Sequence, residues 1–273
     1  MIQSGEIQSI AGKIGVRDTQ IEKDYVISWV IHGIANSSFL KKHLIFKGGT
    51  VLKKVYFPDY RFSEDLDFTF KGKNFNVDVI NAAFDELKEW VYEESRISLI
   101  MKDPIQHETG NFNFYLAYTG PLGGLGTTKD IKVDISQNEL ICNSPEEKYI
   151  IYMYSDLIQE KCKILCYTLE EVIAEKMRSI MQRTIPRDIY DLWYLFEIEK
   201  QNIEDYIFLF EDKAKYKGFD PCVFTKVLTQ KEKVFVRHWQ EHLTNQMTEI
   251  PEFSKVWREL RKHWRTFQKF IEH

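Results

Sequence analysis

Asp65 and Asp67 are separated by one residue in a segment whose pattern is typical of a β-strand. On a strand, residues i and i+2 lie on the same face, and two rises of roughly 3.4 Å place their α-carbons about 7 Å apart. Carboxylates at that spacing can converge on one or two hard divalent cations, while each ion keeps waters and phosphate oxygens as its other ligands. The pair therefore predicts a Mg²⁺ site, with Mn²⁺ as an alternative ion.

A double-glycine turn precedes these carboxylates. Gly48 and Gly49 allow a backbone turn that is closed to other residues. A helix that opens at Thr50 would offer free N–H groups and a positive dipole end to a phosphate. Either feature alone is common by chance, but glycine turn, helix and D-h-D strand in this order within one short unit are much more specific. The segment therefore predicts a phosphate cradle beside a metal site.

Three elements are expected to position these groups. Residues 44–46 form a short strand, the helix follows the glycine turn, and a second strand carries the two aspartates. Alternation along the second strand places Leu66, Phe68 and Phe70 on a packed apolar face. Its opposite face carries Ser63, Asp65, Asp67 and Thr69.

A further strand at residues 131–136 repeats this alternation and carries Asp134 on its polar face. Two-metal phosphoryl transfer uses a third carboxylate from a neighbouring strand, so Asp134 is expected to join Asp65 and Asp67. The alternative is an edge-strand aspartate that pairs with Lys132 or solvent. The glycine-rich residues 120–126 lie between two expected strands and open no helix, which favours a hairpin or flap over a phosphate loop.

From Thr168 onward the sequence is typical of helices. Thr168 and Glu171 have the spacing of a capping box, in which each side chain accepts a backbone N–H of the first turn. Lys176 lies beside the buried stripe of this helix, so its ammonium has to reach solvent or meet an anion. Arg187 and Asp191 are four residues apart on the next expected helix and could form a surface ion pair.

The strings FKGGT and RFSEDLDF resemble the GG[ST]…DxD motif of DNA polymerase β-type nucleotidyltransferases and, more narrowly, the R-x-S-x-D-h-D strand of the AbiEii/AbiGii toxin family. IEKDYVISWVI resembles the segment that precedes the glycine turn in that family. EKMRSIMQRTIPRDIYDLW resembles its downstream E-K helix and R-D-h-h-D-L motif. The likeness runs from about residue 21 to residue 195. For Lys23 and Asp24, within the first helix (residues 18–36), a solvated surface is the favoured interpretation.

The resemblance implies a division of roles among these residues. The expected nucleotide-binding residues are Gly48, Gly49, Thr50, Arg61, Ser63, Lys176 and Arg187. The expected catalytic residues are Asp65, Asp67, Lys176, Asp188 and Asp191, and the expected metal ligands are Asp65, Asp67 and Asp134. Lys176 would neutralise triphosphate charge.

Composition sets outer bounds on the protein. A chain with 44% hydrophobic residues can bury one large core or two modest ones. The N-terminus has no signal-peptide core and no run approaches the roughly twenty apolar residues that span a bilayer, so a cytoplasmic protein without membrane contact is expected. The four cysteines show neither a C-x-x-C pair nor a regular disulfide framework, which favours reduced thiols.

Charge is uneven along the chain. The net charge is −4, yet residues 213–273 hold 13 Lys and Arg against 7 Asp and Glu. Much of this excess lies in the last expected helix, where five basic residues form one stripe beside an apolar face: Lys255, Arg258, Lys262, Arg265 and Lys269. The stripe is either a solvated face or a surface for an RNA acceptor or a partner.

These observations predict an α+β protein. Residues 1–160 would form a mixed-sheet nucleotidyltransferase core with flanking helices, and residues 161–273 an α-helical lobe, with the active site between them. The expected activity is Mg²⁺-dependent transfer of a nucleotide from an NTP to an acceptor such as tRNA. The resemblance implies the toxin of a bacterial toxin–antitoxin or phage-defence system, with a cognate antitoxin. The alternatives are a DxD glycosyltransferase that uses nucleotide sugars and a non-catalytic nucleotide-binding module.

Overall fold

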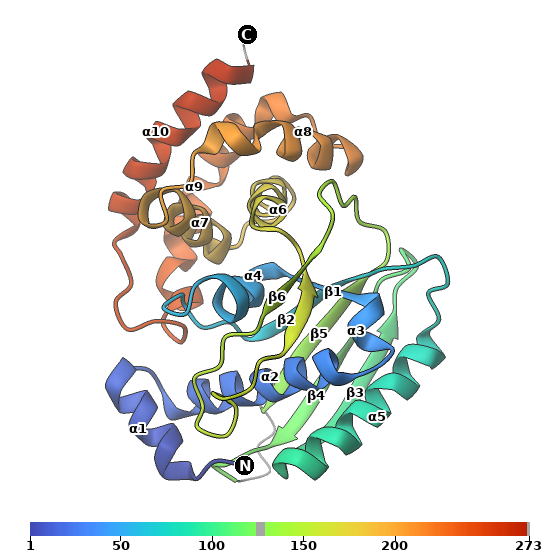
Figure 1. Ribbon diagram of the computed structural model, residues 1–273. Helices are drawn as coiled ribbons and strands as arrows, with labels where there is room; N and C mark the ends of the chain where they lie inside the picture. The colour runs from blue at the N-terminus through green and yellow to red at the C-terminus, as the bar shows by residue number, and fades with distance from the viewer. Residues whose placement is uncertain (124–128, 272–273) are drawn as a thin grey trace. The chain divides into compact units, whose positions relative to one another are not determined.

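The structure, a computed structural model, describes residues 1–123 and 129–271 and is an α+β fold, as predicted (Figure 1). The chain divides into two compact units. The first comprises Met1–Glu139 and Pro145–Tyr167, and the second comprises Leu140–Ser144 and Thr168–His273. Among the described residues, no helix is both long and apolar enough to cross a bilayer.

The described part of the first unit contains a seven-stranded mixed sheet with the order β3-β4-β5-β2-β1-β7-β6. Its strands are β1 (Leu44–Lys47), β2 (Asp65–Phe70), β3 (Ser98–Gln106), β4 (Phe112–Thr119), β5 (Asp130–Ser136), β6 (Glu146–Tyr149) and β7 (Lys163–Cys166). β1 pairs antiparallel with β2 and parallel with β7, and β2 pairs parallel with β5. The strands that carry the predicted aspartates are therefore neighbours in the middle of the sheet.

Helices flank this sheet. They are α1 (Ser4–Ile14), α2 (Asp18–Asn36), α3 (Leu40–His43), α4 (Gly48–Val51), the π-helical segment η1 (Leu52–Tyr56) and α5 (Val77–Ser95). The Asn76 side chain caps α5 by accepting the backbone N–H groups of Asp78 and Val79. Phe84 of α5 packs edge-on against Phe114 of β4, on the apolar face of the sheet.

The predicted alternation along the central strands is confirmed. Leu66 and Phe68 on β2, and Val133 on β5, are fully buried, whereas Asp65, Asp67 and Asp134 are half-buried. β4 and β5, which are consecutive in the chain, pair antiparallel. Residues 124–128 of the glycine-rich loop lie outside the described residues.

The predicted solvated surface of α2 was wrong for Asp24. It is 1% exposed, and its Oδ2 accepts hydrogen bonds from Lys54 Nζ (2.6 Å) and from the Tyr154 hydroxyl (2.7 Å). The segment around Tyr154 covers the face of α2 that looked external in the sequence. Lys23 keeps a partly exposed ion pair with Glu64 at 3.6 Å.

The second unit is helical. It contains α6 (Leu169–Gln182), α7 (Pro186–Trp193), the π-helical segment η2 (Tyr194–Ile198), the 3₁₀ turn η3 (Ile203–Tyr206), α8 (Ile207–Tyr216), the 3₁₀ turn η4 (Pro221–Val223), α9 (Phe224–Leu243) and α10 (Phe253–Ile271). An aromatic cluster of Phe210, Phe224, Trp264 and Phe267 ties α8, α9 and α10 together, with ring centroids 4.9–5.5 Å apart in most pairs.

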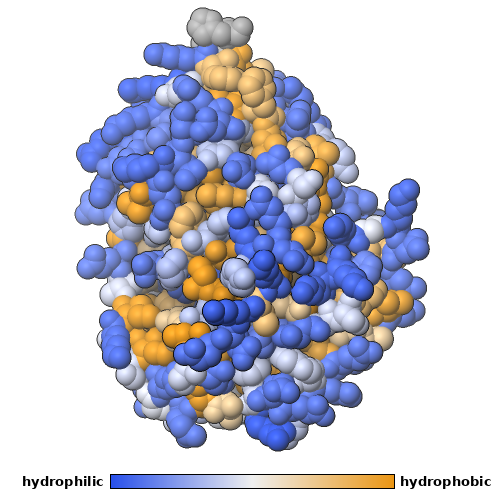
Figure 2. Space-filling model, in the orientation of Figure 1, coloured by the Kyte–Doolittle hydropathy of each residue, from blue (hydrophilic) through white to orange (hydrophobic). Residues whose placement is uncertain are grey.

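α10 buries the predicted apolar face through Val256, Trp257, Leu260, Trp264 and Phe267. All five residues of the basic stripe are exposed. Figure 2 shows mainly hydrophilic side chains over α10, in the upper left of the view.

Candidate active site

The glycine turn and the Asp67 carboxylate are built against each other. Gly48 has φ +82°, and a Cβ at this position would lie 2.2 Å from Asp67 Oδ2. No side chain fits there, and L-residues rarely adopt that backbone conformation. The cross-strand pair of Lys47 and Asp67 sets this contact. The helix begins at Gly48, two residues earlier than predicted, because Gly48 itself makes the turn from β1.

The other predicted phosphate-binding residues gather around Gly49. A Cβ on Gly49 would lie 3.1 Å from Arg61 Nη2 and 3.4 Å from Ser63 Oγ. The Thr50 hydroxyl donates a 2.5 Å hydrogen bond to the backbone carbonyl of Asp65, which ties the start of the helix to β2. The structure thus brings the GGT turn and the R-x-S-x-D-h-D strand into one place, and their roles in binding stay predictions.

Asp134 lies directly beside Asp67 in the parallel register of β2 and β5. Of the alternative interpretation, the edge position is wrong, because β5 lies between β4 and β2, but the pairing of Asp134 with Lys132 is confirmed. Its Oδ2 is 2.7 Å from Lys132 Nζ. Burial lowers the pKa of Lys132, but the hydrogen bond and charge of Asp134, with the charge of Asp65, outweigh it and raise that pKa.

The donor set on this face fits a hard divalent cation. It consists of half-buried carboxylates on adjacent strands. One of them, Asp67, faces the space at Gly48 that any side chain would fill. Within the described residues, however, Asp65, Asp67 and Asp134 are not a group whose ligand oxygens all lie within 4.8 Å of one another. Asp134 would have to turn from Lys132 to join the other two.

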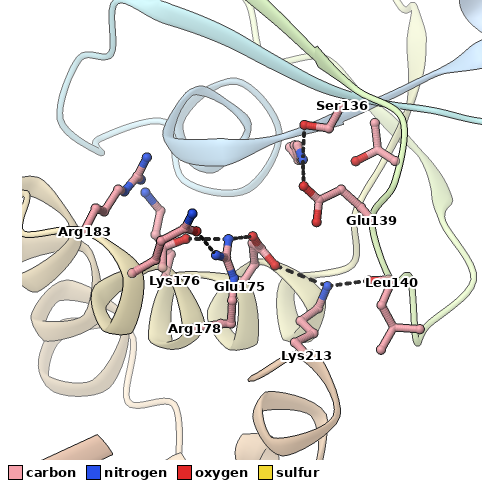
Figure 3. Close-up of polar contacts among 12 residues, drawn as sticks. Ser136, Glu139, Leu140, Glu175, Lys176, Arg178, Arg183 and Lys213 are labelled. Carbon is pink, nitrogen blue, oxygen red and sulfur yellow. Dashed lines mark hydrogen bonds and ion pairs between the residues drawn. The ribbon is translucent and has the colours of Figure 1, made fainter. Parts of the chain in front are cut away.

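Lys47 is a residue that sequence reasoning missed. It is the last residue of β1, is 8% exposed and lies on the same face as Asp67. Its ammonium is 3.2 Å from Ser136 Oγ and 3.6 Å from Glu139 Oε1, two residues labelled in Figure 3. A lysine immediately before the glycine turn was the available signal.

In the second unit, Lys176, Asp188 and Asp191 meet in a buried cluster. Lys176 Nζ lies 2.9 Å from Asp188 Oδ1 and 2.8 Å from Asp191 Oδ2. The ammonium therefore meets anions, one of the two outcomes predicted for it. Arg183, which the sequence did not single out, binds Asp188 through Nε (2.8 Å) and Nη2 (3.0 Å).

The charges around Asp188 favour its ionised form. Complete burial raises the pKa of its carboxyl, but Lys176 and Arg183 outweigh burial and hold that pKa below its usual value. Arg187 lies on the same helix, and its charge adds to burial in lowering the pKa of the His242 imidazole.

The predicted capping box is half correct. Thr168 Oγ1 accepts the Glu171 N–H at 3.2 Å. The Glu171 carboxylate does not serve its own helix start, because it accepts the backbone N–H groups of Cys142 and Asn143 and lies 2.5 Å from Lys213 Nζ. Figure 3 shows Lys213 extending to the Leu140 carbonyl and to Glu175.

Comparisons with known proteins agree with this geometry. Residues 33–272 match the family described as nucleotidyl transferase AbiEii toxin, type IV toxin–antitoxin system. No match was found among curated protein sequences. Among solved structures, MenT4, a nucleotidyltransferase toxin from Mycobacterium tuberculosis H37Rv, is similar at a TM-score of 0.65 and 16% identity, covering 98% of this chain and 90% of that one.

A second similar structure is JHP933 from Helicobacter pylori, with a TM-score of 0.57 and 17% identity, covering 94% of this chain and 95% of that one. At such identities the likeness shows the fold. The family match covers most of the chain and includes the glycine turn, the aspartate strand and the Lys176 cluster. The chain therefore belongs to the AbiEii family of nucleotidyltransferase toxins of type IV toxin–antitoxin systems.

Proposed function

We propose that this toxin transfers a nucleotide from an NTP to an acceptor and releases pyrophosphate, using Mg²⁺ held by Asp65 and Asp67. The observation that carries the proposal is the contact between the Asp67 carboxylate and Gly48, where a Cβ would lie 2.2 Å from Oδ2. A carboxylate pressed against a helix-opening glycine turn puts a cation ligand beside N–H groups that can bind phosphate.

Each predicted phosphate-binding residue of the first unit then has a defined task. The backbone of Gly48 and Gly49 binds phosphate oxygens, and the Arg61 guanidinium and Ser63 hydroxyl, which border Gly49, extend that cradle. The Thr50 hydroxyl fixes the turn to β2 through the Asp65 carbonyl. A bound divalent cation would offset phosphate charge and activate the attacking oxygen.

Asp134 is proposed as a third ligand that exchanges its bond to Lys132 for the cation. Its register position beside Asp67 supports this exchange. Both groups of the present pair are about one-third exposed, so the bond between them is a weak one to break.

For the second unit we propose that Lys176 and Arg187 take part in binding the NTP. The positions of Asp188 and Asp191, on either side of the Lys176 ammonium, support a positioning role for these two carboxylates. Lys176→Met should therefore raise the KM for NTP, whereas a KM equal to that of the wild type would assign the cluster to folding alone.

We propose tRNA as the acceptor, with the exposed basic stripe of α10 as a surface that supports it. NTP and tRNA coincide in the bacterial cytoplasm, where the toxin would act and where a cognate antitoxin would restrain it. A role in phage defence follows if infection relieves that restraint.

The test is incubation with each labelled NTP, Mg²⁺ and total RNA, tracing the label into RNA or protein. Asp67→Asn should lower the rate at least about 100-fold, because a lost metal ligand removes several kcal/mol of charge stabilisation. Asp78→Asn, an exposed carboxylate at the start of α5, is the matched control and should leave the rate unchanged. Wild-type turnover by Asp67→Asn would reject the proposal, and label found only in protein would reject the RNA acceptor.

A further inference from the structure

A second group of potential metal ligands lies in the first unit, away from the aspartate strands. His32 is on α2, and Glu160 and Cys162 are in the segment that leads into β7. One ligand atom from each of these residues lies within 4.8 Å of the other two. In Figure 1 the segment between β6 and β7 passes over α2, and the His32–Tyr152 hydrogen bond joins the two elements. The group shares no residue with the Asp65 and Asp67 site.

The spacing of these atoms is close to that of a tetrahedral zinc site. Zinc bonds of about 2.0–2.1 Å to nitrogen, 2.3 Å to sulfur and 2.0–2.2 Å to oxygen place neighbouring ligand atoms about 3.3–3.8 Å apart. Side-chain adjustments of about 1 Å would therefore bring the three atoms onto one ion. An imidazole and a thiolate prefer Zn²⁺ over Mg²⁺, which selects oxygen ligands.

The imidazole is already oriented. His32 Nδ1 is 2.7 Å from the Tyr152 hydroxyl, and the ring, which is 6% exposed, packs beside the rings of Trp29 and Trp90, with centroids 5.6 and 5.5 Å away. Metal-binding histidines commonly make such a second hydrogen bond, which fixes the ring and tunes the ligand. A rotation of the ring would break this bond, so His32 is held in one orientation.

An entry path to the group is present. Glu160 is exposed, and Cys162 borders a pocket of about 270 Å³ that Asn36, Lys41, Lys161 and Lys163 also line. An ion can therefore reach the thiol from solvent, while His32 anchors the site from the buried side.

We propose that His32, Glu160 and Cys162 bind one Zn²⁺ ion, with a water as fourth ligand, and that the ion fastens α2 to the segment ahead of β7. The ion shares no ligand with the nucleotide site. It stabilises the unit that holds the nucleotide site without contributing a ligand to catalysis.

Cobalt provides a direct probe, because a Co²⁺–thiolate bond gives a near-ultraviolet charge-transfer absorption that carboxylate sites do not. The full-length protein is titrated with Co²⁺ and then with Zn²⁺ in excess Mg²⁺, which occupies oxygen-ligand sites. One equivalent of Co²⁺ should produce the band, and Zn²⁺ should remove it. Zn²⁺ at about 100 times its Kd should raise Tm by about 5 °C or more.

Variants identify the ligands. Cys162→Ser should abolish the band, and Glu160→Gln, an exposed substitution that leaves the core intact, should weaken Zn²⁺ binding more than tenfold. Tyr152→Phe should weaken binding about 10- to 100-fold with the band retained. Cys222→Ser, an exposed cysteine of the second unit, is the matched control and should behave as wild type.

The absence of a charge-transfer band from the wild-type protein would overturn the proposal. So would a band that survives Cys162→Ser, or Zn²⁺ affinity unchanged in Glu160→Gln. The proposal is independent of the nucleotidyl transfer test, because none of these measurements uses an NTP.

Discussion

At the scale of single residues, the proposed nucleotide site depends on the lack of a side chain at Gly48. Gly48 contributes space and a positive φ, and both are required by the position of Asp67. The D-x-D spacing and the double glycine were visible in the sequence, but the contact between them depends on the pairing of β1 with β2 and could only be inferred from the family motif. Lys47 was missed because its partners, Ser136 and Glu139, are about 90 residues away in the sequence. Arg183 was missed although its partner Asp188 is only five residues away, because their contact depends on the turn between α6 and α7.

Gly48→Ala should abolish nucleotidyl transfer and destabilise the fold. The new methyl group would overlap Asp67 Oδ2, and alanine at φ +82° costs about 1–2 kcal/mol before any clash. Gly218→Ala is the matched control, since Gly218 has φ +78° with nothing within 4 Å of its added Cβ. Denaturant unfolding and transfer assays on both variants separate backbone strain from the clash. Equal loss of stability with retained activity in both would show that the Asp67 contact is dispensable.

Asp188 should make the free energy of unfolding depend on pH in the acid range. Its folded pKa lies below the unfolded value, since Lys176 and Arg183 outweigh burial, so its contribution is present above the unfolded pKa of about 3.9 and is lost as pH falls through the folded pKa. Asp188→Asn should be less stable at neutral pH and should lose less on acidification. Measuring the free energy of unfolding of both proteins between neutral pH and about pH 2 tests this. On unfolding in acid, the variant should take up about one proton fewer than the wild type. Parallel pH profiles would contradict it.

At the scale of elements, the periodicity of apolar residues predicted helices and strands, whereas elements that depend on pairing with a distant strand were missed. α2, the strand that begins near Ile131 and the apolar face of α10 appear where alternation or helical spacing placed them. β6 and β7 were not predicted, because no glycine turn marks their ends as one marks the end of β1, and because they depend on pairing with each other and with β1. Glu171 had the spacing of a helix cap, but its carboxylate binds the backbone of Cys142 and Asn143. The residues next to Glu171 in the sequence do not indicate this distant partner.

Lys231, on α9, links that helix to the C-terminus of α6. Its ammonium donates to the backbone carbonyls of Ile180, Met181 and Arg183 at 2.6, 3.1 and 3.0 Å, at the C-terminus of α6. Lys231→Met should cost about 1–3 kcal/mol, because it leaves these carbonyls without the cation that favours a helix C-terminus. Lys233→Met, exposed on the same helix, is the control. A denaturation midpoint that falls equally in both variants would show that the contact adds nothing.

At the scale of the whole molecule, the acidic first part and basic end of the chain suggest different partners. A cation in the first unit and a polyanion along α10 are the ligands that these charges would attract. Family membership and the α+β class were both predictable from sequence. The acceptor was not predictable in the same way, because a solvated basic face and a basic face that binds RNA have the same composition.

Replacing Arg258, Lys262 and Arg265 by Gln should weaken use of the RNA acceptor and leave NTP binding unchanged. Three lost phosphate contacts should also flatten the dependence of log affinity on log salt by about 2. The control is Lys226, Lys233 and Arg237 to Gln, which removes the same charge from exposed positions of α9. Acceptor labelling that responds alike to both triple variants would mean that net charge, and not the stripe, matters.

The position of β1 in the sheet also orders events during synthesis. β1 pairs with β7 through Phe46 and Cys166, about 120 residues later in the chain, so one edge of β1 stays open until β7 has been made. Pairing over such a separation is slow, and domains fold as units while the chain emerges. The glycine turn follows β1 directly, so the proposed nucleotide site stays incomplete until more than half of the chain has been synthesised. Products that stop before residue 163 would be inactive and would carry an unprotected strand edge that favours aggregation.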